Sequence, residues 1–129
     1  MAHKYISEIM NIENTPYGWC GEEDYRNLKW REQRRIYGFD ERETWSLDTT
    51  FMYWLYERLM MFKEVNCINL DFHKFNINGK EMTQRECIDK MIENCKIYIQ
   101  NIYIDDELAY NLKNENLEIL KECIHSMWW

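Results

Sequence analysis

The chain is poor in the residues that make sharp turns, with 4 glycines and 1 proline among its 129 residues. Such scarcity argues against a meander of many short strands and favours long helices. The sequence also lacks an apolar run of the about 20 residues needed to span a bilayer, because Asp48, Glu57 and Arg58 interrupt its most apolar stretch. We therefore expect no membrane segment and, from the length alone, a single domain.

Cysteine usage indicates neither a disulfide framework nor a zinc site. The cysteines are odd in number, have no Cys-x-x-Cys spacing, and no histidine is placed to complete a zinc set; they are Cys20, Cys67, Cys87, Cys95 and Cys123. Cys87 and Cys95 fall on or beside the apolar face of one expected helix, which favours packing. We expect reduced, mostly buried thiols, with no metal and no cofactor.

Positive charge is also in short supply, since 16 Lys and Arg stand against 23 Asp and Glu, giving a net charge of -7. This balance argues against non-specific DNA binding and against binding to an anionic membrane, because both need a cationic surface. The amino terminus has acidic residues and no long apolar core, so it does not read as a secretory signal. We expect the protein in the cytoplasm of the cell that makes it.

No motif for catalysis is present. His73 and His125 are isolated from any Ser, Cys or carboxylate at a recognisable spacing, although residues of a triad need not be close in sequence. We therefore assign no catalytic residue and expect a protein that acts by binding and not by turnover.

Apolar periodicity predicts an all-α, single-domain helical bundle of about four to five helices, spanning 22–129 and preceded by an irregular arm over 1–21. The first predicted helix covers 22–37, with acidic residues in its first turn and Gly38 as its stop. A central helix begins somewhere between Asp40 and Asp48 and ends near Val65.

Three further features are predicted towards the carboxyl end. Residues 66–80 form a polar connection with a turn at Asn78-Gly79. Thr83 and Glu86 make a capping box that opens a helix continuing to Ile102, although 97–104 could also be read as strand. Apolar periodicity resumes after Asp105-Asp106 and shifts phase between Leu112 and Leu117, which predicts a short helix, a break over 113–116 and a final amphipathic helix.

The central predicted helix places a charged residue, Arg58, among apolar residues. At about 100° per residue, Arg58 projects between Leu47 and Phe51, on a stripe that continues with Leu55, Leu59 and Phe62. Asp48 lies ten residues away, about 15 Å along the helix, and cannot pair with it. A charge that faces the core needs a partner. Either another helix supplies a carboxylate such as Asp89 or Glu93, or the arginine head reaches water, or Arg58 binds an anionic ligand.

Aromatic and basic residues add further candidates. Trp45 and Trp54 flank the central helix and could stack on a base or belong to the core. A basic cluster could receive phosphates or form a solvated face, and consists of Arg26, Lys29, Arg31, Arg34 and Arg35. Acidic residues of the first half could mimic nucleic acid or be ordinary solvated acids. The terminal Trp128 and Trp129 either fold onto the core or cap a partner chain, so a homo-oligomer is a candidate.

The chain also resembles a set of small helical proteins of bacteriophages and prophages over roughly residues 35–129. The matching residues, in order, are Gly38-Phe39, Thr44-Trp45-x-Leu47-Asp48, Arg58-Leu59, Phe62-Lys63, Ile88-Asp89-Lys90-Met91-Ile92, and Glu115-Asn116-Leu117 through Trp128. Glu43 and Gln84 depart from the pattern, where relatives tend to carry Asp and Trp. The resemblance implies a phage accessory protein and carries over no catalytic residue.

Two functional hypotheses follow from the sequence. In the preferred one, the protein sequesters an anionic, nucleotide-derived immune signal of the host, and the ligand-binding residues are Arg58, Trp45, Trp54, Asp48, Arg34 and Arg35. In the alternative, it inhibits or adapts a host defence protein through an acidic or tryptophan-containing surface.

Overall fold

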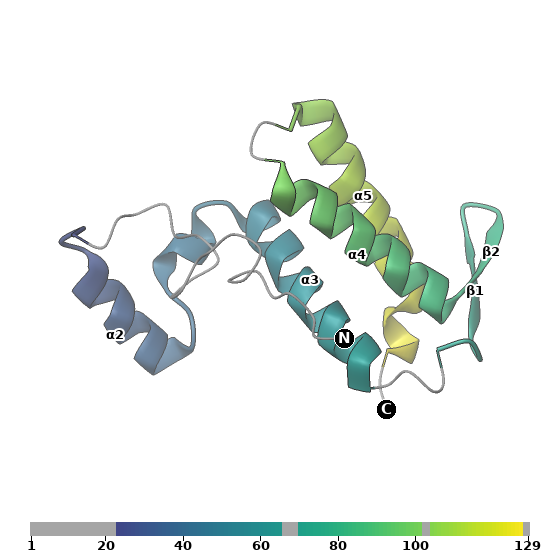
Figure 1. The fold of residues 1–129 in the computed structure, drawn as a ribbon, viewed down its shortest axis with the longest axis horizontal. Coiled ribbons are helices and arrows are strands. Elements are labelled where there is room, and N and C mark those ends of the chain that lie inside the picture. Colours follow the sequence, from purple (N-terminus) through teal and green to yellow (C-terminus); the bar gives the residue numbers. More distant parts are fainter. Residues whose placement is uncertain (1–22, 66–69, 102–103, 128–129) are drawn as a thin grey trace. The chain divides into compact units, whose positions relative to one another are not determined.

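A computed structural model describes residues 23–65, 70–101 and 104–127 (Figure 1). The chain divides into two compact units, unit 1 (Met1–Phe51) and unit 2 (Met52–Trp129), and each is described by itself. The arm expected over 1–21 and the terminal tryptophans lie outside the described residues.

The expected all-α class is confirmed, because 73% of the described residues are helical and they include four α-helices with one small β-hairpin. The elements are α2 (Asn27–Tyr37), the short 3₁₀ helix η1 (Glu41–Thr44), α3 (Leu47–Val65), β1 (Lys74–Ile77), β2 (Lys80–Thr83), α4 (Gln84–Gln100), α5 (Asp106–Cys123) and η2 (Ile124–Ser126). Within 23–65, 70–101 and 104–127, no helix combines the length and the apolar composition that crossing a membrane requires.

Helix α2 begins later than its charge pattern predicts. The Asp24 side chain accepts a hydrogen bond from the backbone N–H of Arg26, and the Asp24 carbonyl accepts one from Asn27, so a turn precedes the helix. Glu23 and Asp24 therefore stand before the helix and not in its first turn. The predicted stop is confirmed, since Gly38 has a left-handed φ of 84° and its N–H bonds to the Arg34 carbonyl.

Helix α3 ends at Val65, as predicted, and it buries Leu55 and Leu59 of the predicted stripe, but its buried face is rotated away from the other members of that stripe. The buried residues are Met52, Tyr53, Leu55, Tyr56 and Leu59. Burial of the two tyrosines and of Met52 rotates the core face away from Leu47, which is 67% exposed. Tyrosine buries a large ring although it carries a polar tip, and counting only aliphatic residues and phenylalanine placed the face wrongly.

A β-hairpin starts within the predicted connection over 66–80 and extends beyond it to Thr83, and only its turn was predicted. Asn78 and Gly79 both have positive φ, 52° and 86°, as a two-residue type I′ turn needs, so the predicted turn is confirmed. Strand β1 pairs antiparallel with β2, with Ile77 opposite Lys80. The strands have four residues each and are mostly polar, so they are too short and too polar to be predicted from apolar alternation. β1 lies against α5, and β2 lies against α4.

Helix α4 starts with the predicted capping box. The Thr83 side chain accepts from the Glu86 backbone, and the Glu86 side chain accepts from the Thr83 backbone. The buried face includes Cys87, Ile88, Met91, Cys95 and Ile99, in agreement with most of the predicted stripe. The helix ends at Gln100, and Ile102, the last member of that stripe, lies outside the described residues.

Helix α5 is continuous, so the predicted break over 113–116 is wrong. Its buried residues are Leu112, Asn116, Ile119 and Cys123, spaced as one helical face. The apolar phase seemed to shift because an asparagine occupies a core position while Leu117 is 53% exposed. Helices α4 and α5 pack side by side (Figure 1).

Two buried amides of unit 2, those of Asn94 and Asn116, are hydrogen-bonded to each other. Asn94 of α4 donates to the Asn116 side-chain oxygen at 3.0 Å and to Glu115 at 2.7 Å. The Asn116 amide nitrogen lies within hydrogen-bonding distance of the Met91 carbonyl and of the Cys95 and Met52 sulfurs. An amide pair of this kind fixes which residues of two helices face each other, because any slip would leave both amides unpaired.

The described cysteines are buried and unpaired, as expected for packed thiols; they are Cys87, Cys95 and Cys123. Burial raises the pKa of Cys95 and of Cys123 to about 12, so both stay protonated near neutral pH. Cys20 and Cys67 lie outside the described residues.

The Asn94–Asn116 contact can be tested by truncation. Asn116→Ala should lower the free energy of unfolding by about 1–3 kcal/mol, because it removes buried hydrogen bonds and leaves a void. Leu117→Ala, at an exposed position one residue further, should change it by less than about 0.5 kcal/mol. Urea denaturation followed by circular dichroism measures both. Equal effects of the two substitutions would contradict the role given to Asn116.

Candidate binding site

Among the described residues the buried charged side chains are Asp40 and Arg42, both in unit 1. The side chains of Asp40 and Arg42 are 1% and 3% exposed and join at 2.8 Å. Asp40 caps η1 by accepting the Arg42 backbone N–H at 3.0 Å, and it also accepts from Arg42 Nε at 3.0 Å and from Arg34 at 2.6 Å. One carboxylate therefore ends a loop, neutralises a buried guanidinium and ties α2 to η1.

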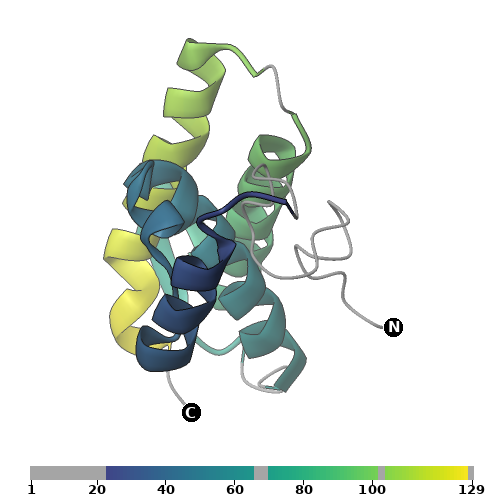
Figure 2. The same cartoon turned by 90° about the vertical axis from the view of Figure 1, so that its left-hand side faces the viewer.

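A tryptophan fills the space beside this ion pair. Trp30 is fully buried, and its indole N–H donates to Glu41 at 3.0 Å. The guanidinium of Arg42 lies 4.3 Å from a Trp30 ring centroid, that of Arg26 lies 4.8 Å away, and Trp45 meets Trp30 edge-on at 5.9 Å. Figure 2 shows α2 of unit 1 in dark blue. Cation–π contacts and the buried Asp40–Arg42 ion pair thus form the core of the described part of unit 1.

The basic cluster of α2 is largely occupied by the chain's own acids. Arg26 pairs with Asp24, Lys29 with Glu41, Arg34 with Asp40 and Arg35 with Glu32. A phosphate would have to displace a carboxylate from Arg34 or Arg35, the two members assigned to ligand binding. The cluster is therefore better explained as structure and solvated surface than as a phosphate site.

Arg58 does not lie in the core, and its predicted position on a buried stripe is wrong. It is exposed on α3, its guanidinium lies 4.9 Å from a Trp54 ring centroid, and its Nη1 is 3.4 Å from the Trp54 carbonyl. Asp89, one of its expected partners, is bound to Lys63. Among the described residues no carboxylate pairs with Arg58.

Exposed apolar residues accompany Arg58 along the same side of the helix. Trp54, Met61 and Val65 are 48%, 51% and 56% exposed. With Arg58 they fall within about a 60° arc of the helix, on the side opposite the buried residues Met52 and Leu59. We call these four residues the outer face of α3, and all four belong to unit 2.

The other predicted site residues lie in unit 1. Trp45 is 48% exposed and contacts Trp30 and Arg26, so it is partly a core residue. Asp48 is in the first turn of α3, where it accepts from the Ser46 hydroxyl and from the Thr49 backbone. Of the six predicted residues, the structure brings together Arg58 with Trp54. It does not join either of them to Arg34, Arg35 or Asp48 within one unit.

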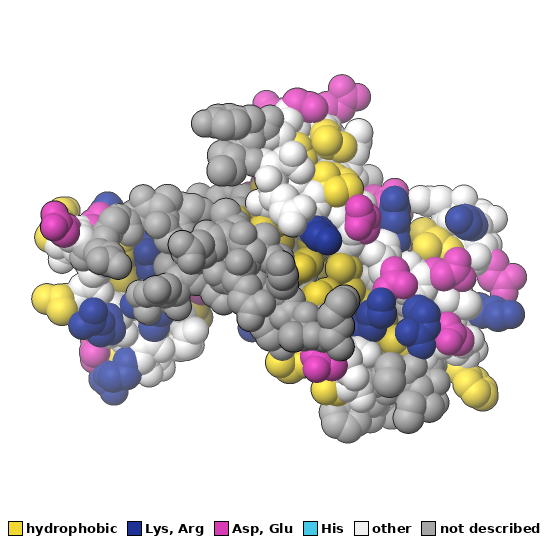
Figure 3. All heavy atoms as spheres, in the orientation of Figure 1, with side chains coloured by type: hydrophobic (Ala, Val, Ile, Leu, Met, Phe, Trp, Pro, Cys, Tyr) yellow, Lys and Arg dark blue, Asp and Glu magenta, His cyan; other side chains and the backbone are white. Residues whose placement is uncertain are grey.

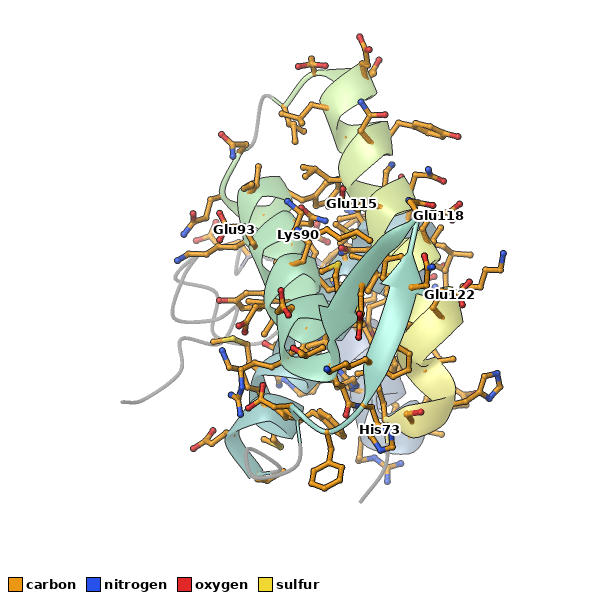
Figure 4. The ribbon with its side chains drawn as sticks, turned by 90° about the vertical axis from the view of Figure 1, so that its right-hand side faces the viewer. His73, Lys90, Glu93, Glu115, Glu118 and Glu122 are labelled. Carbon is orange, nitrogen blue, oxygen red and sulfur yellow. The ribbon has the colours of Figure 1, made fainter. Side chains whose placement is uncertain are left out.

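The acidic side chains of α5 are a second candidate binding surface. Figure 4 shows Glu115, Glu118 and Glu122 along α5, with Lys90 and Glu93 on α4. Glu115 is held by Lys90 at 3.5 Å and by Asn94. Figure 3 shows acidic and basic side chains interspersed over the face of unit 2 that it presents. No group of three or more His, Cys, Asp or Glu among the described residues is placed to hold a metal ion.

In comparisons with protein-family models, curated proteins and solved structures, nothing matches the chain.

The role of Asp40 can be measured directly. Asp40→Ala should lower the free energy of unfolding by about 3–5 kcal/mol, because it leaves Arg42 as a buried, unpaired charge. Glu32→Ala removes the exposed partner of Arg35 and should cost less than about 1 kcal/mol. Tryptophan fluorescence during urea unfolding reports both. If Asp40→Ala cost no more than Glu32→Ala, the ion pair would not be what holds unit 1 together.

The same carboxylate predicts a dependence of stability on pH. Burial raises the pKa of Asp40, but hydrogen bonds from Arg42 and Arg34 outweigh burial and hold that pKa below its ordinary value. The unfolded chain therefore takes up the proton first, at about pH 4, and the contribution of Asp40 to stability declines as the pH falls further. The difference in unfolding free energy between the wild type and Asp40→Ala should narrow below about pH 4. A difference that stays constant down to pH 2 would refute this assignment.

Proposed function

We propose that this chain is a non-catalytic binding protein that holds a protein partner on the outer face of α3. The observation that carries the proposal is the composition and exposure of this face. Trp54, Met61 and Val65 are each about half exposed, although they are apolar. They line up with Arg58 on the side of α3 that the core of unit 2 does not use.

Residue types favour a protein partner over a small molecule. Tryptophan, methionine and arginine are enriched in protein interfaces, and tryptophan and arginine are frequent hot spots. The outer face follows one helix for about 16 Å, from Trp54 to Val65, and the surface of a single helix is convex. Small-molecule sites enclose most of their ligand in a concave pocket, which a convex surface does not offer by itself.

The resemblance to phage and prophage proteins supports a source for the partner. In a phage accessory protein, the protein that is bound and inhibited or redirected would belong to the host. This is the alternative hypothesis of the sequence analysis, with the tryptophan-containing surface now assigned to Trp54 and its neighbours.

Sequestration of a nucleotide-derived signal is the second candidate, and one observation favours it. The Arg58 guanidinium stacks on Trp54 and has no carboxylate partner among the described residues. Such a pair can stack a base on the indole and bind a phosphate through the guanidinium.

Site-specific photocrosslinking tests the protein-binding proposal. A photoreactive amino acid at Met61 should give a discrete cross-linked product in the producing cells, because this position lies in the middle of the outer face. The same amino acid at Lys121, an exposed position on α5, is the matched control and should give none. Trp54→Ala should abolish the Met61 product without changing the circular dichroism spectrum. An absent cross-linked product, or one that forms equally well at Met61 and at Lys121, would refute the proposal of a protein partner.

Thermal-shift measurements decide the second candidate. Cyclic dinucleotides and cyclic ADP-ribose isomers would raise the melting temperature of the wild type if one of them were bound, because ligand binding stabilises the folded state by mass action. Arg58→Ala, at an exposed position, should keep its own melting temperature and lose that increase. We expect no increase with the wild type. An increase that depends on Arg58 would replace the protein-binding proposal with nucleotide sequestration.

A further inference from the structure

We propose that the partner's docking element is an amphipathic α-helix that presents a carboxylate to Arg58. This inference rests on the proposed function and names the partner class for the same surface. Three observations support it: the spacing of the residues on the outer face, the need of the Arg58 guanidinium for a counter-charge, and the absence of an acidic residue from the outer face.

The spacing of the outer face is that of a helix–helix seam. Trp54, Arg58, Met61 and Val65 follow one another at intervals of four, three and four residues. This alternation repeats every seven residues, so the side chains stay on one line facing a second helix that packs nearly parallel to α3. An extended strand has a side-chain period of two and would meet only part of this line.

Arg58 determines the charge of the partner. It stands between Trp54 and Met61 in the seam, so a helix packed on this face would remove its guanidinium from water. Stacking on Trp54 covers a face of the guanidinium plane, and Nη1 donates to the Trp54 carbonyl at 3.4 Å, while the remaining N–H donors at its edge need acceptors. A buried cation without a counter-charge is strongly unfavourable, whereas a carboxylate can accept two of its N–H groups.

The seam itself contains no acidic residue, so a second copy of the chain would not supply that carboxylate from the equivalent positions. Two copies would instead bury two arginines, and each chain carries a net charge of -7. Charge complementarity therefore points to a different protein, with a helix that is apolar on its contact face apart from one acidic residue.

A charge-swap experiment with two synthetic peptides tests the inference. Both peptides are amphipathic helices of about three heptads with leucine at the seam positions. One has glutamate at the central seam position, and the other has lysine there. Fluorescence anisotropy of the labelled peptides should show that the full chain binds the glutamate peptide at least about tenfold more tightly. Arg58→Glu should reverse this preference, and Arg58→Lys should preserve it.

The outcomes separate this inference from the proposed function. A Met61 cross-link in cells, combined with no peptide preference or with one that Arg58→Glu leaves unreversed, would overturn the helix inference and leave protein binding standing. Failure of both experiments would remove the proposed function as well. Sedimentation of the wild-type chain alone provides the third arm, because a dimer dissolved by Arg58→Glu would assign the face to a second copy and overturn the choice of a different protein.

Discussion

A buried polar group obliges the surrounding chain to supply its hydrogen-bond partners, and this requirement organises both units. In unit 1 the Asp40 carboxylate accepts from Arg42 and Arg34, so the loop after α2 is held at one carboxylate. In unit 2 the buried Asn116 accepts from Asn94 and is surrounded by α3 and α4 atoms. Apolar contacts alone tolerate sliding, whereas these polar contacts are satisfied in one arrangement only. Each unit is thus specified by a few directional interactions placed within an otherwise adaptable core.

Elements whose ends carry their own chemical signal could be predicted from the sequence. The capping box at Thr83 and the left-handed Gly38 act locally, through atoms a few residues away, and both were found where the sequence placed them. The path of α5 could not be predicted, because its continuity depends on Asn116 lying in the core. A polar residue reads as exposed until its partner is known, and that partner, Asn94, is on another helix.

The candidate site shows the same limit. Apolar residues surround Arg58 in the sequence, and this pattern predicted that Arg58 would face the core. The buried arginine is instead Arg42, in a polar segment. Its signal is the short motif Asp40-x-Arg42 after a helix stop, in which an aspartate can cap a turn and bind the arginine two residues on. Arg58 remains a candidate binding residue because it is exposed, and not buried, beside Trp54. Periodicity identified the residues of α3 that share a side, but it could not decide which side the core of unit 2 would use.

The buried thiols of unit 2 make the opening of this unit measurable. Cys95 and Cys123 are fully buried, and burial raises the pKa of both to about 12, so in the folded state few thiolates form and neither sulfur is exposed to a reagent in solvent. Modification of either sulfur has to wait until the helices separate. The rate at which a thiol reagent consumes them consequently reports how often unit 2 opens, whatever the redox potential of its surroundings.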